Sequence, residues 1–147
     1  MQSKKHIEEK FTKRSDGRSK KKKERVSDAY LLKLWDEICR KRAGNRCEFP
    51  GCGNIETLVS HHWISRGNKA LCYCPENAML LCNHHHVSGD LSAHRSPKEF
   101  QRIIINSGVR TQEWLDDLII RKNQIVRFNN GFRCDWKVTL QELRLAA

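Results

Sequence analysis

Two closely spaced pairs of cysteine and histidine constrain the fold of this 147-residue chain more than any other feature. Cys47 and Cys52 flank Pro50-Gly51, a dipeptide that favours a tight turn. Cys82 and His85 have the i, i+3 spacing that places two side chains on one face of a helix. Three thiolates and one imidazole form the closed tetrahedral ligand set of a structural zinc ion. We therefore expect a zinc knuckle, with buried thiols in an ordinary core as the alternative.

The cellular compartment decides between metal ligands and disulfides. Seven cysteines would also suit a secreted disulfide scaffold, but residues 2–25 are polar and lack the apolar core of a signal peptide. In a reducing compartment, cysteines interleaved with histidines are more often metal ligands. No segment approaches the roughly 18 to 20 apolar residues that span a membrane. We expect a cytoplasmic protein without a membrane partner.

Positive charge is concentrated in the first 26 residues. This segment carries eleven Lys or Arg against four acidic residues, in a chain whose formal net charge is +11. It has almost nothing apolar to bury, so we expect a disordered arm. The arm either aids solubility or binds phosphates through its basic side chains, whose contacts release counterions from nucleic acid. The four that we expect to bind nucleic acid are Lys20, Lys21, Lys22 and Lys23.

The remaining residues divide into a core over 27–96 and a helical extension over 97–147. Apolar residues recur at helical spacing after Ser27-Asp28 and predict a helix that ends before Gly44. Two strands are expected at 56–63 and 70–74, joined by a turn at Arg66-Gly67-Asn68. Residues 78–82 are expected to begin a helix.

Helices are also expected in the extension. A capping box at 96–99, with Pro97 at the first helical position, predicts a helix to about Asn106. A further helix is expected over 114–125, with Trp114, Leu118 and Ile125 in the core. A hairpin is expected around 130–131, and a short last helix is capped at 139–142.

The remaining histidines suggest a second site. His86 directly follows His85, so about 100° of helix rotation separates them and they cannot serve the same metal ion. His61 and His62 are neighbours in an expected strand and must point to opposite sides. One of that pair can bind a metal ion with His86, while the other approaches it as an unligated base. His84 is expected to face solvent, and Cys39, Cys72, Cys74 and Cys134 to pack in the core.

Three stretches resemble one known family in order and spacing. They are residues 61–68 (His-His-Trp-Ile-Ser-Arg-Gly-Asn), 75–82 (Pro-Glu-Asn-Ala-Met-Leu-Leu-Cys) and His85-His86. With the cysteine knuckle, they resemble the HNH (His-Asn-His) endonucleases, and phage-type members most. The resemblance covers about residues 44–100. It implies an α+β fold with a small ββα-metal core and a zinc knuckle, flanked by helices and the basic arm.

The resemblance also implies roles for single residues. His61 and His86 would bind the catalytic metal ion, His62 would be the general base, and Asn77 would fix the loop before the helix. His94 or Asp90 are further candidate metal ligands, and Arg66 a candidate nucleic-acid contact. In this family an aspartate often stands at the place of His61, and a cysteine at that of His85. Magnesium is used widely in the family, but imidazole ligands favour zinc, nickel or manganese.

The expected function is metal-dependent endonuclease cleavage of DNA, leaving 5′-phosphate and 3′-hydroxyl ends. The alternative is a zinc-knuckle protein that binds nucleic acid without cleaving it, as part of a phage packaging or recombination complex. Only the enzyme explains why a set of histidines and an asparagine accompanies the four zinc ligands.

The charge of the arm leads to a first testable prediction. Deleting residues 1–26 removes a net charge of +7, so non-specific affinity for DNA should fall and its dependence on salt should weaken, because fewer counterions are released. Fluorescence-anisotropy titrations across a salt series measure both quantities. If affinity and salt slope are unchanged, the arm contributes only to solubility.

Overall fold

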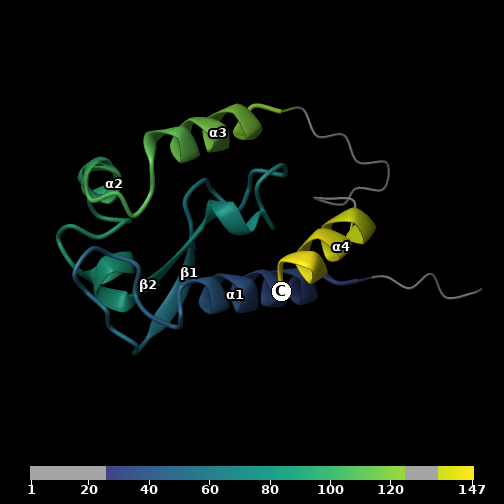
Figure 1. Ribbon diagram of the computed structural model, residues 1–147, viewed down its shortest axis with the longest axis horizontal. Helices are drawn as coiled ribbons and strands as arrows, with labels where there is room; N and C mark the ends of the chain where they lie inside the picture. The colour runs from purple at the N-terminus through teal and green to yellow at the C-terminus, as the bar shows by residue number, and fades with distance from the viewer. Residues whose placement is uncertain (1–25, 125–135) are drawn as a thin grey trace, which may run out of the picture.

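The computed structural model describes residues 26–124 and 136–147. It is an α+β fold in which a small two-stranded sheet lies among helices (Figure 1). The element order is α1 (Asp28–Arg42), β1 (Leu58–His62), a 3₁₀ turn η1 (Pro75–Asn77), β2 (Ala78–Cys82), a π-helical turn η2 (His84–Ser88), α2 (Pro97–Asn106), α3 (Gln112–Lys122) and α4 (Trp136–Ala146).

The sheet is an antiparallel pair whose register runs from Leu58 opposite Cys82 to His62 opposite Ala78. Every residue of β2 is buried, whereas β1 is partly exposed. Met79 and Leu81 of β2 pack with Phe100 and Ile104 of α2 in one apolar cluster. The core therefore includes residues on both sides of the expected boundary at 96–97.

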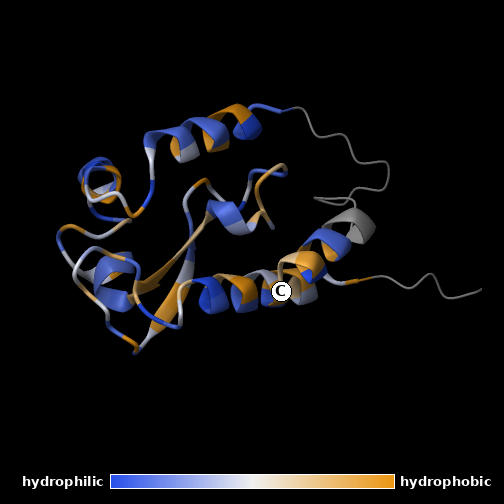
Figure 2. Cartoon of the chain, in the orientation of Figure 1, coloured by the Kyte–Doolittle hydropathy of each residue, from blue (hydrophilic) through white to orange (hydrophobic). Residues whose placement is uncertain are grey.

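Helix α1 confirms the helix expected after Ser27. The Ser27 hydroxyl oxygen accepts a hydrogen bond from the Tyr30 amide at 3.1 Å, which satisfies one of the unpaired donors at the helix start. The buried face includes Leu31 and Trp35, and α4 packs against it through Leu140 and Leu143. Polar and apolar residues alternate along the helices, as expected for elements with one buried face (Figure 2).

The second strand is not where the sequence pattern placed it. Residues 70–74, expected to be a strand, form turns and irregular structure, and residues 78–82, expected to begin a helix, form β2. The reason is burial. Five consecutive buried residues carry no alternation of polar and apolar side chains, so a buried strand and a buried helix segment look alike in sequence.

The helices of the C-terminal part follow the expected pattern with local differences. Helix α2 has the expected bounds, but Ser96 does not cap it and instead donates from its hydroxyl to the Asp90 carbonyl at 2.8 Å. Helix α3 is capped by Thr111. Helix α4 begins at Trp136, before the cap expected at 139. The expected hairpin, Ile125 and Cys134 lie outside the described residues. Within those residues no helix is long and apolar enough to cross a membrane.

Helix α3 gives a direct test of this packing. Leu118 is fully buried against Leu71 and Cys74, whereas Ile120, on the same helix, is 65% exposed. Leu118→Ala should lower the free energy of unfolding by about 2 to 5 kcal/mol, because it leaves a cavity in the core. Ile120→Ala should change it by less than about 0.5 kcal/mol. Urea denaturation measures both values, and equal losses in the two variants would contradict this placement of α3.

Candidate functional site

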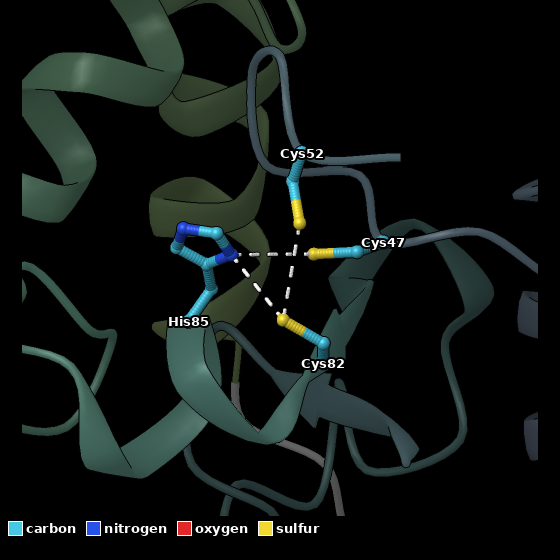
Figure 3. A group of neighbouring side chains, drawn as sticks. All are labelled: Cys47, Cys52, Cys82 and His85. Carbon is cyan, nitrogen blue, oxygen red and sulfur yellow. Dashed lines mark hydrogen bonds between the residues drawn. The ribbon is translucent and has the colours of Figure 1, made fainter. Parts of the chain in front are cut away.

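Three cysteines and one histidine converge in a group that can hold a metal ion. The Sγ atoms of Cys52 and Cys82 lie 3.9 Å apart, and His85 Nδ1 lies 3.3 Å from Cys82 Sγ and 3.6 Å from Cys47 Sγ (Figure 3). All four candidate ligand atoms lie within 4.8 Å of one another. A tetrahedral ion with metal–sulfur bonds of about 2.3 Å would separate two sulfur atoms by about 3.8 Å. The three separations given above are close to this value, so the group is suited to such an ion.

Backbone geometry brings these four residues together. Gly51 has a φ of 73°, in the left-handed region that favours glycine, and closes the turn between Cys47 and Cys52. The Glu48 amide donates to the Leu80 carbonyl at 2.8 Å and fastens this turn to β2. Cys82 ends β2 and His85 lies on η2, so the expectation that one helix carries both residues is wrong. The short spacing nevertheless keeps them neighbours.

Burial and hydrogen bonds shift the pKa values of two thiols of this group in opposite directions. Burial raises the pKa of Cys47 to about 12. Burial also acts to raise the pKa of Cys82, but hydrogen bonds from the His85 amide and from the Cys47 and Cys52 thiols lower it below its ordinary value. Metal ions bind thiolates, so binding at this group must release protons.

Three histidines from separate segments form a second group. His61 on β1, His86 on η2 and His94 in the loop before α2 offer ring nitrogens that all lie within 4.8 Å of one another. The Nε2 atoms of His86 and His94 are 3.2 Å apart. Burial, and after it the charge repulsion from the neighbouring histidines, lowers the pKa of His61 to about 4. Burial also lowers the pKa of His86. Neutral imidazole is the form that binds metal ions.

The turn after η2 places His94 in this group. Its backbone amide donates to the His86 carbonyl at 3.2 Å, and the Ala93 amide donates to the His85 carbonyl at 2.9 Å. At Gly89 a Cβ atom would lie 2.9 Å from the His84 carbonyl oxygen, a backbone atom, so a larger residue would require the turn to shift.

His62 lies apart from the three-histidine group, as expected from the alternation of side chains along a strand. Its Nε2 is 2.8 Å from the Cys72 carbonyl oxygen. A carbonyl can only accept, so Nε2 carries the hydrogen and, in the neutral ring, Nδ1 holds the free lone pair. Burial lowers the pKa of His62, although the Cys72 carbonyl acts to raise it.

Asn77 joins the two ends of the loop between β1 and β2. Its Oδ1 accepts from the Ile64 amide at 2.7 Å, and its Nδ2 donates to the carbonyls of Ile64 at 2.9 Å and Leu71 at 3.2 Å. The side chain is fully buried. Asn77 thus fixes the loop that contains the hydrogen-bond acceptor of His62, rather than a loop leading into a helix.

A cleft of about 510 Å³ lies beside the three-histidine group. The His61, His86 and His94 group, His62 and Arg66 all line it. Asp90, a candidate ligand, and His84 do not line the cleft. Asp90 is highly exposed and pairs with Arg95 at 3.2 Å, and His84 is exposed.

The sequence alone does not settle the roles of two residues at the site, His94 and Trp35. His94 was one of two alternative ligands, because a loop residue eight positions after His86 has no periodic signal. Trp35, which stacks on the His62 ring, belongs to the apolar pattern that predicts α1, and that pattern indicates only a buried side chain. The four basic residues at 20–23 lie outside the described part of the chain.

No protein-family model, curated protein or solved structure matches the chain. The geometry of the two groups and the cleft is therefore the basis for assigning a function.

The cysteine-rich group leads to a prediction about metal content. Cys82→Ser should lose about one equivalent of bound transition metal and should unfold or aggregate, because the binding free energy at such a group is folding free energy. Cys74→Ser is the matched control, since Cys74 is also buried but lies outside both groups. Elemental analysis of purified protein measures the difference. Well-folded wild type with no transition metal would contradict the prediction.

Proposed function

We propose that the protein is a metal-dependent DNA endonuclease of the HNH type. The observation that carries the proposal is that three histidines able to hold a metal ion, and a fourth histidine outside that group, line one cleft. A binding module would need the cysteine-rich group for its fold, but it has no evident use for His61, His62, His86 and His94 arranged in this way.

The two groups suit different metal ions. Three thiolates and one imidazole form a closed set typical of structural zinc, which we propose for Cys47, Cys52, Cys82 and His85. Three imidazoles leave coordination positions for water and substrate. Nitrogen ligands without a carboxylate favour zinc, nickel or manganese over magnesium. We propose one of these borderline metals for the cleft.

The hydrogen bond of His62 supports its role as general base. With Nε2–H held by the Cys72 carbonyl, the lone pair of Nδ1 is free to accept a proton from water. That water attacks the phosphorus, a new P–O bond forms and the bond to the 3′ oxygen breaks. The 3′ oxygen then takes a proton from solvent, which leaves 5′-phosphate and 3′-hydroxyl ends. When bound, the cation supplies charge neutralisation at the phosphate and the departing oxygen.

Charge supports nucleic acid as the substrate. The chain carries a formal net charge of +11, most of it within residues 1–26, and Arg66 lines the cleft. Basic side chains of this kind bind phosphates without reading sequence. We propose that Arg66 contacts the phosphate backbone near the bond that is cut and that the arm holds the flanking DNA.

Replacing His62 and replacing His86 should each impair DNA cleavage, but for different physical reasons. His62→Ala should keep both metal ions and DNA affinity, while the cleavage rate falls by about 100-fold or more, as for a missing general base. His86→Ala should instead weaken metal binding in the cleft, so that activity returns only at high metal concentration. His84→Ala, an exposed neighbour outside both groups, is the matched control and should cleave normally.

The assay uses supercoiled plasmid, linear duplex, single strands and a four-way junction across a series of divalent metals. If His62→Ala cleaves each substrate as fast as wild type, His62 is not the base. If wild type cleaves none of them with any metal, the protein is a non-catalytic binding module, and a packaging or recombination complex becomes its expected setting.

A further inference from the structure

The indole of Trp35 covers one face of the His62 imidazole. The two ring centroids are 3.9 Å apart and the ring planes differ by 11°, so the rings are stacked. Trp35 is 3% exposed and belongs to the core cluster between α1 and α4. A side chain held this firmly offers a fixed surface to the ring that rests on it.

Both rings are also hydrogen-bonded to the same short segment of chain. Trp35 Nε1–H donates to the Cys74 carbonyl at 2.9 Å, and His62 Nε2–H donates to the Cys72 carbonyl at 2.8 Å. Helix α1 therefore acts on His62 in two ways. It supports the face of the imidazole directly, and it fixes the segment that carries the acceptor of His62.

We propose that Trp35 is a positioning residue for His62, which holds the imidazole in one orientation and one tautomer. This inference rests on the proposed function, because it treats His62 as the general base. Trp35 supplies no ligand to either metal-binding group. It acts through its contact with the His62 ring.

The physical reason is that a base must be aimed as well as unprotonated. A free imidazole rotates about two side-chain bonds and exchanges tautomers, and only one combination presents the Nδ1 lone pair to a water molecule while Nε2–H is bound. The stacked indole blocks rotations that would tilt the imidazole away from its orientation parallel to the indole. Misplacement of a catalytic group by about 1 Å can cost about 100-fold in rate.

Two substitutions separate the face contact from simple burial. Trp35→Leu removes the aromatic face and the indole N–H, whereas Trp35→Phe removes the N–H but keeps an aromatic ring of similar position. Leu31→Ala is the matched control, because Leu31 is buried in the same core cluster, four residues before Trp35 on the same helix. It lowers stability but keeps the indole that stacks on His62.

The kinetic test compares kcat and KM for plasmid cleavage at saturating metal, below the unfolding temperature of every variant. Trp35→Leu should lower kcat by about 10- to 100-fold with KM and metal content unchanged, and Trp35→Phe should recover much of the loss. Leu31→Ala should keep the wild-type kcat. A kcat for Trp35→Leu equal to that of Leu31→Ala overturns the proposal.

A measurement without substrate separates this inference from the proposed function. Nitrogen-15 NMR of the histidine rings should show a single Nε2–H tautomer for His62 in wild type and Leu31→Ala, and a tautomer mixture in Trp35→Leu. If His62 has the same single tautomer in Trp35→Leu, the positioning role is refuted whether or not the protein cleaves DNA. If the tautomer changes but wild type cleaves nothing, the positioning role stands and the nuclease proposal fails.

Discussion

The antiparallel pairing of β1 with β2 is the constraint on which the rest of the site depends. Its register sets His62 opposite Ala78 and His61 opposite Met79. The pleat then sends neighbouring histidines in opposite directions, one towards the other two histidines and one onto Trp35. A slip of one residue would exchange them, so the separation of a metal ligand from an unligated base is a property of the strand itself.

Such a short pair of strands needs support from outside the sheet. The described core is small, and two strands alone are at best marginally stable in water. The cysteine-rich group ties the end of β2 and η2 to the turn at 47–52, and α1 and α2 cover the buried strand from separate segments. A metal ion at this group would hold η2 in place, and η2 carries His86 beside His85. The cysteine-rich group and the proposed catalytic group are therefore joined through two adjacent residues.

The sequence allowed the prediction of features that have local signals. Helices α1 and α2 have apolar periodicity and clear starting residues, and the ligand pairs have short fixed spacings. The position of β2 was wrong because a strand buried on both faces has no alternation, and its five residues resemble a buried helix segment. The choice of His94 over Asp90 as a candidate ligand, and the contact of Trp35 with His62, could not be predicted because both depend on tertiary contacts. His94 reaches the site because the backbone around it hydrogen-bonds to η2, and Trp35 meets His62 only once α1 lies against the sheet.

The chemistry of the product ends tests the central claim most directly. Wild-type protein loaded with a borderline divalent metal is incubated with supercoiled plasmid, the reaction is stopped with chelator, and the nicked or linear DNA is treated with DNA ligase, which joins only 5′-phosphate to 3′-hydroxyl ends. Attack of water on phosphorus, with departure of the 3′ oxygen, predicts that the breaks are sealed without any prior end repair. Breaks that ligase seals only after end repair, or plasmid that stays supercoiled with every metal, would contradict this account.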